Sequence, residues 1–369
     1  MFKLTKPQQI YIIVALAVIS FVIIFYFTDS PNNEITLLNT TEQEYKFLSD
    51  PQKLLNITFT YNLNNKNVCS NNTQENILAV FIVTSYFGNV ETRSSMRQAF
   101  SIEDLRKKGL RRVFLLGEAS RDKYTTQKSI NDESRRFGDI IQGNFSEAYR
   151  NLTYKHIMGL KWASTYCPNA KYLIKMDDDT VVNMYILKTM LKSLENIYNK
   201  DFIAGYKLEN MLAIRQTANK WYVTKEEYPS TKYPTFVSGW FYITKPQTAL
   251  KLATIANYQK YFWIDDVFVT GIIAKKLKIL LFDISKYFVI NSEFLQCCLQ
   301  DLNKKIDCDI YVGPNGGDDN MFYKFNEKIK LCLNEGCIKR SKPLNETCVA
   351  EKKVNLGKGD PEINDFRLS

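Results

Sequence analysis

The feature that most constrains the fold is the stretch from Lys171 to Asn183, where an apolar run ends in three consecutive aspartates. Such a run, between turn-prone neighbours, predicts a buried strand. Because side chains alternate along a strand, Asp177 and Asp179 would point to one side and Asp178 to the other. The triplet is either a solvent-exposed acidic turn, the commoner outcome, or a site where carboxylates bind Mg²⁺ or Mn²⁺ beside substrate phosphates.

The elements predicted around this strand alternate between apolar runs and amphipathic segments. Near-continuous apolar runs are typical of strands that are covered on both faces. The alternation therefore predicts an α/β domain. Strands are predicted at residues 77–86, 113–117, 139–142, 202–206, 220–224, 236–244 and 279–284, and helices at residues 91–100, 122–137, 146–166, 184–198, 246–256 and 262–277.

The N-terminal segment 10–27 is uncharged and apolar over 18 residues. As a helix it would span about 27 Å, enough for a thin bilayer of the early secretory or Golgi type. The bulky residues 25–27 are not followed by a small-residue cleavage site, which disfavours a cleaved signal peptide. Lys3 and Lys6 precede the segment, so the positive-inside rule places residues 1–9 in the cytoplasm and the rest of the chain in the lumen.

Cysteines and glycosylation sequons agree with a lumenal address. The eight cysteines are an even number, and an oxidising compartment would pair them. Cys69 and Cys167 stand apart from the six between positions 297 and 348, so they pair with each other if each region forms its own bridges. The net charge of +10 would suggest nucleic acid as a partner in a cytosolic protein, but the membrane segment makes that partner improbable.

The six Asn-x-Ser/Thr sequons are not equally suited to carry a glycan. Asn151 falls within a predicted helix beside an apolar residue, so we expect it to be unmodified, while Asn56 and Asn71 in a polar segment carry glycans. The other sequons are at Asn39, Asn144 and Asn345. His156, the one histidine, lies on the apolar stripe of the same predicted helix and is expected to be a packing residue, not a metal ligand.

Three further groups of residues have both a functional and a structural interpretation. Arg93 and Arg97 lie one helical turn apart and could clamp a diphosphate, although a solvated basic face explains them better by itself. Aromatic residues such as Trp221 and Trp240 could stack on sugar rings, but most are expected in the core. Asp265 and Asp266 form a second acidic pair, which could also serve only to begin a helix.

Taken in order, these segments resemble the β1,3-galactosyltransferase-like family of Golgi glycosyltransferases over about residues 77–280. No single segment is decisive, but eight in the right order are highly specific. The matching segments are ETRSSMRQAF, VFLLG, ESRRFGDII, NFSEAYRNLTYKHIMGLKW, KMDDDTVVN, KWYV with EEYP, YPTFVSGWFYIT and IDDVFVTG.

The resemblance implies a nucleotide-sugar transferase fold of the GT-A type, with a mixed sheet between helices. It implies transfer, with inversion, of galactose or N-acetylglucosamine from a UDP-sugar to the 3-hydroxyl of an acceptor sugar on a glycoprotein or glycolipid, using Mn²⁺ or Mg²⁺. The implied catalytic base is Asp266. The other implied roles are donor binding by Arg93, Arg97, Lys175, Asp177 and Asp178, metal binding by Asp177 and Asp179, and acceptor binding by Asp265, Trp221, Gly239 and Trp240.

The chain departs from the family pattern at three points. Asp265 stands where the family has Glu, Glu147 stands where it has Asp, and no His follows the last predicted strand to join the metal. The metal shell would therefore rest on Asp179, the diphosphate and water. The alternative to an enzyme is a catalytically inactive sugar-binding protein on the same fold.

The domain organisation expected from these observations has five parts. A cytoplasmic tail, residues 1–9, precedes the transmembrane anchor, residues 10–27, and a lumenal stem, residues 28–76. A glycosyltransferase domain follows at residues 77–290. Residues 291–369 form a Cys-rich extension that lies outside the resemblance and has no assigned role. The chain would be a single-pass type II protein of the Golgi membrane.

Overall fold

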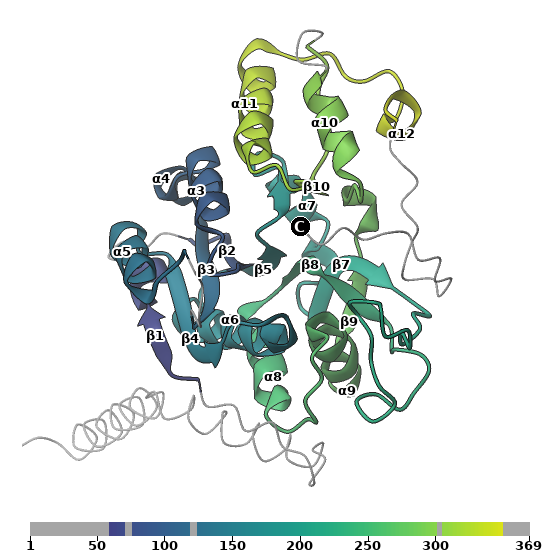
Figure 1. The fold of residues 1–369 in the computed structure, drawn as a ribbon. Helices are drawn as coiled ribbons and strands as arrows, with labels where there is room; N and C mark the ends of the chain where they lie inside the picture. The colour runs from purple at the N-terminus through teal and green to yellow at the C-terminus, as the bar shows by residue number, and fades with distance from the viewer. Residues whose placement is uncertain (1–58, 71–75, 119–123, 301–304, 350–369) are drawn as a thin grey trace, which may run out of the picture. The chain divides into compact units, whose positions relative to one another are not determined.

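The apolar run before the Asp triplet is a strand near the middle of an eight-stranded sheet (Figure 1). The computed structural model describes residues 59–70, 76–118, 124–300 and 305–349. In these residues the order of the large sheet is β1-β4-β3-β2-β5-β8-β7-β9, and a second sheet pairs β10 with β6. The strands are β1 Tyr61–Asn64, β2 Ala79–Thr84, β3 Leu110–Glu118, β4 Ile140–Ser146, β5 Tyr172–Asp177, β6 Thr180–Val182, β7 Phe202–Leu208, β8 Phe236–Thr244, β9 Leu280–Asp283 and β10 Val312–Pro314.

The directions of the strands bring the polar ends of β2, β5 and β8 to one edge. Strands β4, β3, β2 and β5 are parallel, and Thr84 at the end of β2 lies opposite Asp177 at the end of β5. Strand β8 is antiparallel to β5, with Met176 opposite Phe241, so Gly239 and Trp240 lie next to the carboxyl end of β5. The predicted mixed sheet is confirmed, and the acids lie where parallel strands end.

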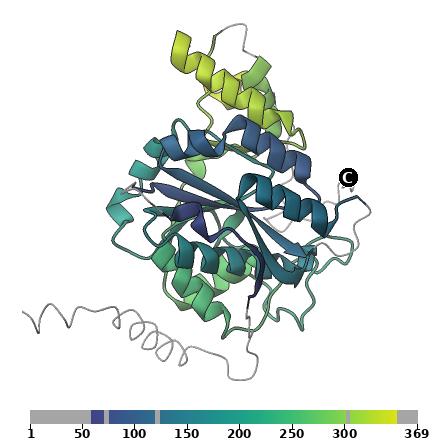
Figure 2. The same cartoon turned by 90° about the vertical axis from the view of Figure 1, so that its left-hand side faces the viewer.

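Helices cover both faces of this sheet, as Figure 2 shows. Helices α6 and α8 contact each other and the sheet on one face, while α3 and α4 lie over the other. The α-helices are α3 Val90–Ala99, α4 Ile102–Lys107, α5 Gln127–Phe137, α6 Leu152–Tyr166, α7 Leu187–Lys192, α8 Pro246–Ala256, α9 Ala274–Lys276, α10 Ser292–Gln300, α11 Asn320–Glu335 and α12 Leu344–Thr347. A π-helix, η4, spans Val267–Ile273, and the 3₁₀ turns are η1 Lys66–Cys69, η2 Tyr149–Asn151, η3 Glu195–Ile197 and η5 Ser285–Tyr287.

Local sequence signals explain where several helices begin and end. Helix α5 begins with a capping box, in which the Thr126 side chain accepts from the Ser129 amide and the Ser129 side chain accepts from the Thr126 amide. It ends at Gly138, whose φ of 64° is left-handed and suits glycine. Helix α8 begins with Pro246 in its first turn and ends at Ala256, the bounds predicted from sequence.

The largest differences between the predicted elements and the structure are at three places. The predicted strand at 220–224 is absent, because the loop around it is held by Arg215, whose guanidinium donates to the carbonyls of Val223, Thr224, Tyr228 and Ser230 at 2.6–2.8 Å. The helix predicted at 184–198 shortens to α7 and η3. The helix predicted to begin at residue 146 begins at Leu152, because β4 continues to Ser146.

Part of the segment predicted as a stem is ordered in the domain. Strand β1 pairs antiparallel with β4, so the sheet begins before residue 77. Its Asn64 donates to the Tyr166 hydroxyl at 3.0 Å and accepts from the Trp162 indole at 2.9 Å. The predicted bridge between Cys69 and Cys167 is confirmed, with Cα atoms 5.2 Å apart. An Asn-rich strand held by polar contacts and a disulfide has no apolar periodicity by which sequence could reveal it.

The described part of the Cys-rich segment completes the core of the domain. Strand β10 pairs with β6, which follows the Asp triplet, and α11 packs on α3. The apolar side chains of Val312 and Phe322 belong to the same buried cluster as Phe81 and Met176. The remaining disulfides join Cys297 to Cys348, Cys298 to Cys308 and Cys332 to Cys337.

The predicted tail, membrane anchor and first part of the stem lie outside the described residues, as do the sequons at Asn39, Asn56 and Asn71. Within the described ranges, no helix has the length and apolar character needed to cross a membrane. Asn151 lies at the N-terminal boundary of α6, and its side-chain amide donates to the Ser146 carbonyl at 2.8 Å. That hydrogen bond uses the nitrogen to which a glycan would attach, and the prediction that Asn151 is unmodified stays a prediction.

Candidate active site

Two acidic pairs that are far apart in sequence line one cavity of about 350 Å³. Asp177 and Asp179 come from the end of β5 and the turn after it, and Asp265 and Asp266 come from the residues at the start of η4. The cavity therefore joins the two groups that sequence analysis identified separately. Its walls are formed by Thr84, Tyr149, Leu152, Lys175, Asp177, Asp179, Lys220, Trp221, Ser238, Gly239, Trp240, Trp263, Ile264, Asp265 and Asp266.

Lys175 and Asp177 form an ion pair in the wall of the cavity. The Lys175 ammonium donates to Asp177 Oδ1 at 2.6 Å and to the Gly239 carbonyl at 2.5 Å. Burial alone would lower the pKa of Lys175, but the carboxylates of Asp177 and Asp265 raise it above its ordinary value. Enclosure raises the pKa of Asp177 even though Lys175 opposes this. The wall thus holds the positive charge of Lys175 next to the carboxylate of Asp177.

The other two aspartates of the triplet lie on different sides of the chain. Asp179 lines the cavity, and burial, followed by repulsion from Asp177 and Asp178, raises its pKa to about 6. Its backbone carbonyl accepts from the amide of Asn315, in the loop after β10, at 2.7 Å. Asp178 does not line the cavity; its carboxylate accepts from the Asn89 side-chain amide at 3.0 Å. The alternation predicted for the triplet is confirmed.

Asp265 and Asp266 have opposite environments although they are neighbours. Burial opposes the ionisation of Asp265, but a hydrogen bond from His156 and the charge of Lys175 outweigh it and lower its pKa. Burial and the charge of Asp265 raise the pKa of Asp266. Asp266 accepts from the Val267 amide at 2.7 Å and the Gly239 amide at 3.2 Å, which fix its orientation. Such a split is typical of an acid–base pair in which one group stays charged.

Gly239 permits the close approach of these groups. A Cβ atom at this position would lie 3.0 Å from the Cβ of Asp266 and 3.6 Å from the Lys175 ammonium. The first contact is tighter than ordinary side-chain contacts, so a larger residue in β8 would push the Asp266 carboxylate out of place. Gly239 was predicted to bind an acceptor, and the structure gives it this packing role as well.

Aromatic side chains form another part of the cavity wall. The Trp221 indole donates to the Tyr149 hydroxyl at 3.0 Å, and the Tyr149 and Trp263 rings lie 6.0 Å apart. Trp240 packs edge-on against Phe288, with ring centroids 5.1 Å apart. Trp221 and Trp240 were predicted here, whereas Tyr149 and Trp263 were not. Tyr149 lies within the matching segment NFSEAYRNLTYKHIMGLKW and Trp263 directly precedes IDDVFVTG, and these positions were the available signal.

The structure places Arg93 and Arg97 away from the cavity, which corrects their predicted role as a diphosphate clamp. Arg93 is fully buried and makes two bonds to Glu133, at 2.8 and 2.7 Å. Arg97 makes two bonds to Asp139, at 2.9 and 2.8 Å, and one to Glu133 at 2.7 Å. The spacing correctly predicted that both arginines lie on one face of α3. Their guanidinium N–H groups, however, are bonded to the buried carboxylates of Glu133 in α5 and of Asp139, which precedes β4.

Arg93 also holds the loop after β2, which follows the cavity residue Thr84. Its guanidinium donates to the carbonyl of Tyr86 at 2.8 Å and to that of Phe87 at 3.0 Å. Glu147 is one of the three departures from the family pattern, and both of its carboxylate oxygens accept hydrogen bonds. Its carboxylate accepts from the Lys155 ammonium at 2.5 Å and from the Gly117 amide at 2.8 Å. Lys155 in turn donates to the Ser85 carbonyl at 2.6 Å, so these contacts fix the same loop.

The donor set of the cavity suits a hard divalent cation but supplies few ligands. Asp177 and Asp179 offer carboxylate oxygens, the ligands that Mg²⁺ and Mn²⁺ prefer. Burial raises the pKa of both groups by more than the attraction of Lys175 offsets. Among the described residues, no three His, Cys, Asp or Glu side chains converge as a metal-binding group. The remaining ligands would have to come from a bound phosphate and water.

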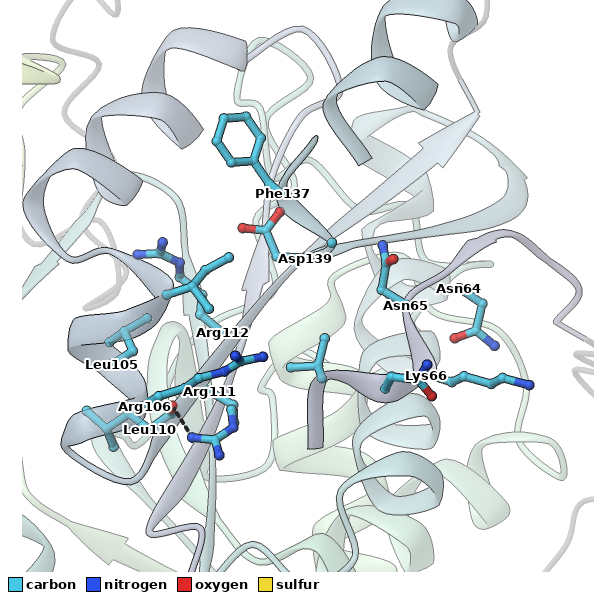
Figure 3. Close-up of a pocket in the computed structure, with 14 residues that line it drawn as sticks. Asn64, Asn65, Lys66, Leu105, Arg106, Leu110, Arg111, Arg112, Phe137 and Asp139 are labelled. Atoms are coloured by element: carbon cyan, nitrogen blue, oxygen red, sulfur yellow. Dashed lines mark hydrogen bonds between the residues drawn. The ribbon is translucent and has the colours of Figure 1, made fainter. Parts of the chain in front are cut away.

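A second cavity, of about 340 Å³, lies at the other end of the sheet (Figure 3). Leu110 at the start of β3 lines it and pairs with Ala79 at the start of β2, whereas Thr84 at the end of β2 lines the acidic cavity. Its Asp139 carboxylate is bonded to Arg97, and Arg112 donates to the carbonyls of Met96 and Phe100. With its one carboxylate already paired, this cavity offers no acid–base chemistry, so the acidic cavity is the candidate active site.

In comparisons with known proteins, the matched region contains every residue that lines the acidic cavity except Thr84. The family model described as Galactosyltransferase matches residues 91–285. The chain is 36% identical over 203 residues to beta-1,3-galactosyltransferase 5 of Gorilla gorilla gorilla, which covers 55% of this chain and 66% of that protein. It is 33% identical over 225 residues to beta-1,3-galactosyltransferase 2 of Homo sapiens, with 60% and 52% covered. In both comparisons the match spans less than two thirds of the relative's length.

Solved structures give a weaker likeness. The chain aligns with a glycosyltransferase involved in the glycosylation of the major capsid of PBCV-1, at 11% identity, over 68% of this chain and 99% of that one. The TM-score is 0.36, which is too low to carry an argument.

Proposed function

This chain belongs to the galactosyltransferase family, and we propose that it is an inverting hexosyltransferase that uses a UDP-sugar. The acceptor group would be the 3-hydroxyl of a sugar on a glycoprotein or glycolipid. The observation that carries the proposal is the meeting of Asp177 and Asp179 with Asp265 and Asp266 in one cavity. The names of the relatives favour galactose over N-acetylglucosamine as the transferred sugar.

Asp266 is the proposed catalytic base. Inverting transfer needs one group that takes the proton from the acceptor hydroxyl as the new bond forms. The two amides that hold Asp266, from Val267 and Gly239, bond one to each carboxylate oxygen and leave lone pairs for the hydroxyl. A pKa raised by burial and by Asp265 brings its proton affinity closer to neutral pH, where a general base is most effective.

The triplet side of the cavity is the proposed donor site. Asp177 and Asp179 would hold Mn²⁺ or Mg²⁺ together with the diphosphate. Such an ion acts as a Lewis acid that offsets negative charge on the leaving group. Lys175, bonded to Asp177, keeps that carboxylate oriented and adds a positive charge to the donor wall. Asp178 supports the turn through Asn89 and acts on the donor only through that turn.

The aromatic side of the cavity is the proposed acceptor site. Trp221 and Trp240 are half-buried and present ring surface on which the apolar face of a sugar can stack. Asp265, next to the base, offers a carboxylate for acceptor hydroxyl groups. These residues line the same cavity as Asp177, Asp179 and Asp266, so an acceptor bound to them would lie beside both the donor and the base.

We also propose that the protein is a single-pass type II protein of the Golgi membrane, anchored through residues 10–27 with the active site in the lumen. The pairing of all eight cysteines in disulfides supports an oxidising compartment.

A donor screen with the full-length protein in detergent tests the proposal. UDP-galactose, UDP-N-acetylglucosamine and other UDP-sugars would be offered with a panel of acceptor glycosides, and both UDP release and the glycan product would be measured. We expect an acceptor-dependent product with UDP-galactose. Acceptor binding without any product from any donor would instead support a sugar-binding protein on the same fold.

A further inference from the structure

His156 forms a contact that the proposed function leaves unexplained. It lies on α6, it is 1% exposed, and both ring nitrogens are bonded. Nδ1 lies 2.8 Å from Oδ2 of Asp265, and Nε2 lies 2.6 Å from the hydroxyl of Tyr242 in β8. Sequence analysis predicted a packing residue that binds no metal. The side chain is packed, but it also joins the sheet to an acid of the cavity.

The partners of the ring determine where its protons lie. Burial lowers the pKa of His156, so the ring is neutral and carries one proton. Burial raises the pKa of Tyr242 far above its ordinary value, so the phenol keeps its proton. An ionised carboxylate can only accept, which places the ring proton on Nδ1 and leaves Nε2 to accept from Tyr242. The donors thus form one chain, from Tyr242 to His156 and from His156 to Asp265.

We infer that His156 is a positioning residue that holds Asp265 as a fixed, ionised carboxylate and through it tunes Asp266 as the base. The inference rests on the proposed function of the cavity. Three observations carry it: the short contacts at both ring nitrogens, the burial of the ring, and the position of Asp265 directly beside Asp266.

No charged group near Asp265 in the described residues donates the hydrogen bond that His156 donates to it. Lys175 attracts Asp265 electrostatically, but its ammonium is bonded to Asp177 and to the Gly239 carbonyl. The negative charges of Asp266 and Asp177 disfavour the ionised form of Asp265. Among the described residues, His156 is the side chain that hydrogen-bonds Asp265.

The direction of the effect on Asp266 follows from these charges. While His156 donates, Asp265 keeps its negative charge, and repulsion raises the pKa of Asp266. Without that donor, burial raises the pKa of Asp265, which then takes up a proton as the pH falls. The repulsion is lost, and the pKa of Asp266 decreases. Removing His156 should therefore move the acidic limb of the pH profile in the same direction as removing the charge of Asp265.

The experiment compares the pH dependence of acceptor kcat/KM in the full-length wild type, His156→Leu, Asp265→Asn and the double variant. We expect His156→Leu to shift the acidic limb to lower pH by about half a unit or more and to raise the acceptor KM about fivefold or more. The donor KM should change less than about twofold. Asp265→Asn should shift the limb the same way, and His156→Leu should add no further shift to it.

Two further variants separate this role from simple packing. His156→Asn places an amide donor near the position of Nδ1, and we expect its acidic limb to return towards that of the wild type. Thr248→Val removes another buried hydrogen bond to a carboxylate, that of Asp201, outside the cavity lining, and should leave the limb unchanged. If His156→Leu does not fold, His156→Phe, which also lacks a donor to Asp265, carries the same comparison with His156→Asn.

An unshifted acidic limb in a folded His156→Leu or His156→Phe protein would overturn the inference. So would an additional shift when His156→Leu is combined with Asp265→Asn, because His156 would then act independently of Asp265. Failure of the proposed function is distinguishable, since it would appear as a lack of transfer by the wild type in the same assay.

Discussion

Asp265 and Asp266 are the same residue type but have different surroundings in the structure. Both are aspartates, and the sequence places them side by side at the start of a helical segment. The structure gives Asp265 a histidine donor and gives Asp266 two backbone amides and a like charge. Which acid is the base could be taken from the family resemblance but not from the residue types, because the surroundings come from α6 and β8.

Replacement of Asp266 by Asn tests the base directly. The variant keeps the size of the side chain and loses the proton acceptor. We expect turnover to fall by roughly two to four powers of ten, with UDP binding little changed. Asp265→Asn should be milder and act mainly on acceptor affinity. Near-normal turnover of Asp266→Asn at saturating donor and acceptor would place the base elsewhere.

The pH profile of the wild type is a second residue-scale prediction. Asp266 accepts a proton only when ionised, and its pKa is raised, so activity should fall as the pH decreases through a value above that of an ordinary Asp. The acidic limb of kcat/KM measures this. A limb at or below the ordinary Asp range would show that Asp266 is not the group that titrates.

Replacement of Asp179 by Ala tests the proposal that transfer needs a divalent metal ion. The Asp179 carboxylate lines the cavity and makes no side-chain bond to Lys175, which instead bonds Asp177. We expect Asp179→Ala to abolish transfer and EDTA to inhibit the wild type, with activity restored by added Mn²⁺. Full activity in excess chelator would remove the metal from the mechanism.

The helical spacing of Arg93 and Arg97 was predicted correctly, but their donors face buried carboxylates and not the cavity. The ion pair of Arg93 with Glu133 is buried, and removal of one partner leaves the other uncompensated. We expect Arg93→Ala to lower the free energy of unfolding by about 3–5 kcal/mol. Denaturant unfolding measures this, with the exposed Lys107→Ala as the control, because its pair with Glu103 is on the surface. A loss of donor affinity without a loss of stability would restore the role in donor binding.

At the scale of elements, sequence predicted what depends on local pattern and missed what depends on distant partners. The buried strands β2, β3, β5 and β8 and helix α8 followed from apolar runs and turn residues. Strand β1 did not, because it is held by β4 and a disulfide. The pairing of β10 with β6 could not be predicted either, because nothing local in the Cys-rich segment indicates that it lies beside the Asp triplet.

Deletion of the Cys-rich segment is the prediction at this scale. Residues after 290 supply Leu295, Val312, Phe322 and Phe325 to the main core, so a chain that ends at Ile290 would expose the side chains they cover. We expect that chain to be insoluble or to lack cooperative unfolding. A soluble and active truncated protein would show that the segment is a separate extension.

At the scale of the whole molecule, the described domain includes β1, and the proposed role of the N-terminal segment is membrane anchoring. The domain brings the two acidic pairs, Lys175 and the aromatic residues of the cavity to the same edge of its sheet. That convergence came from topology: β5 and β8 are neighbours in the sheet although residues 178–235 separate them in sequence. Motif order indicated the family, and the strand order explains why the motifs meet.

The configuration of the product tests the central claim most directly. UDP-galactose carries an α-linked sugar, and a single displacement assisted by one base on the acceptor side inverts it. Proton NMR of the glycan formed from UDP-galactose and a suitable acceptor by the full-length protein would read the anomeric configuration and the linkage. We predict a β-linked galactose on the 3-hydroxyl. An α-linked product would contradict the single-base mechanism in this cavity.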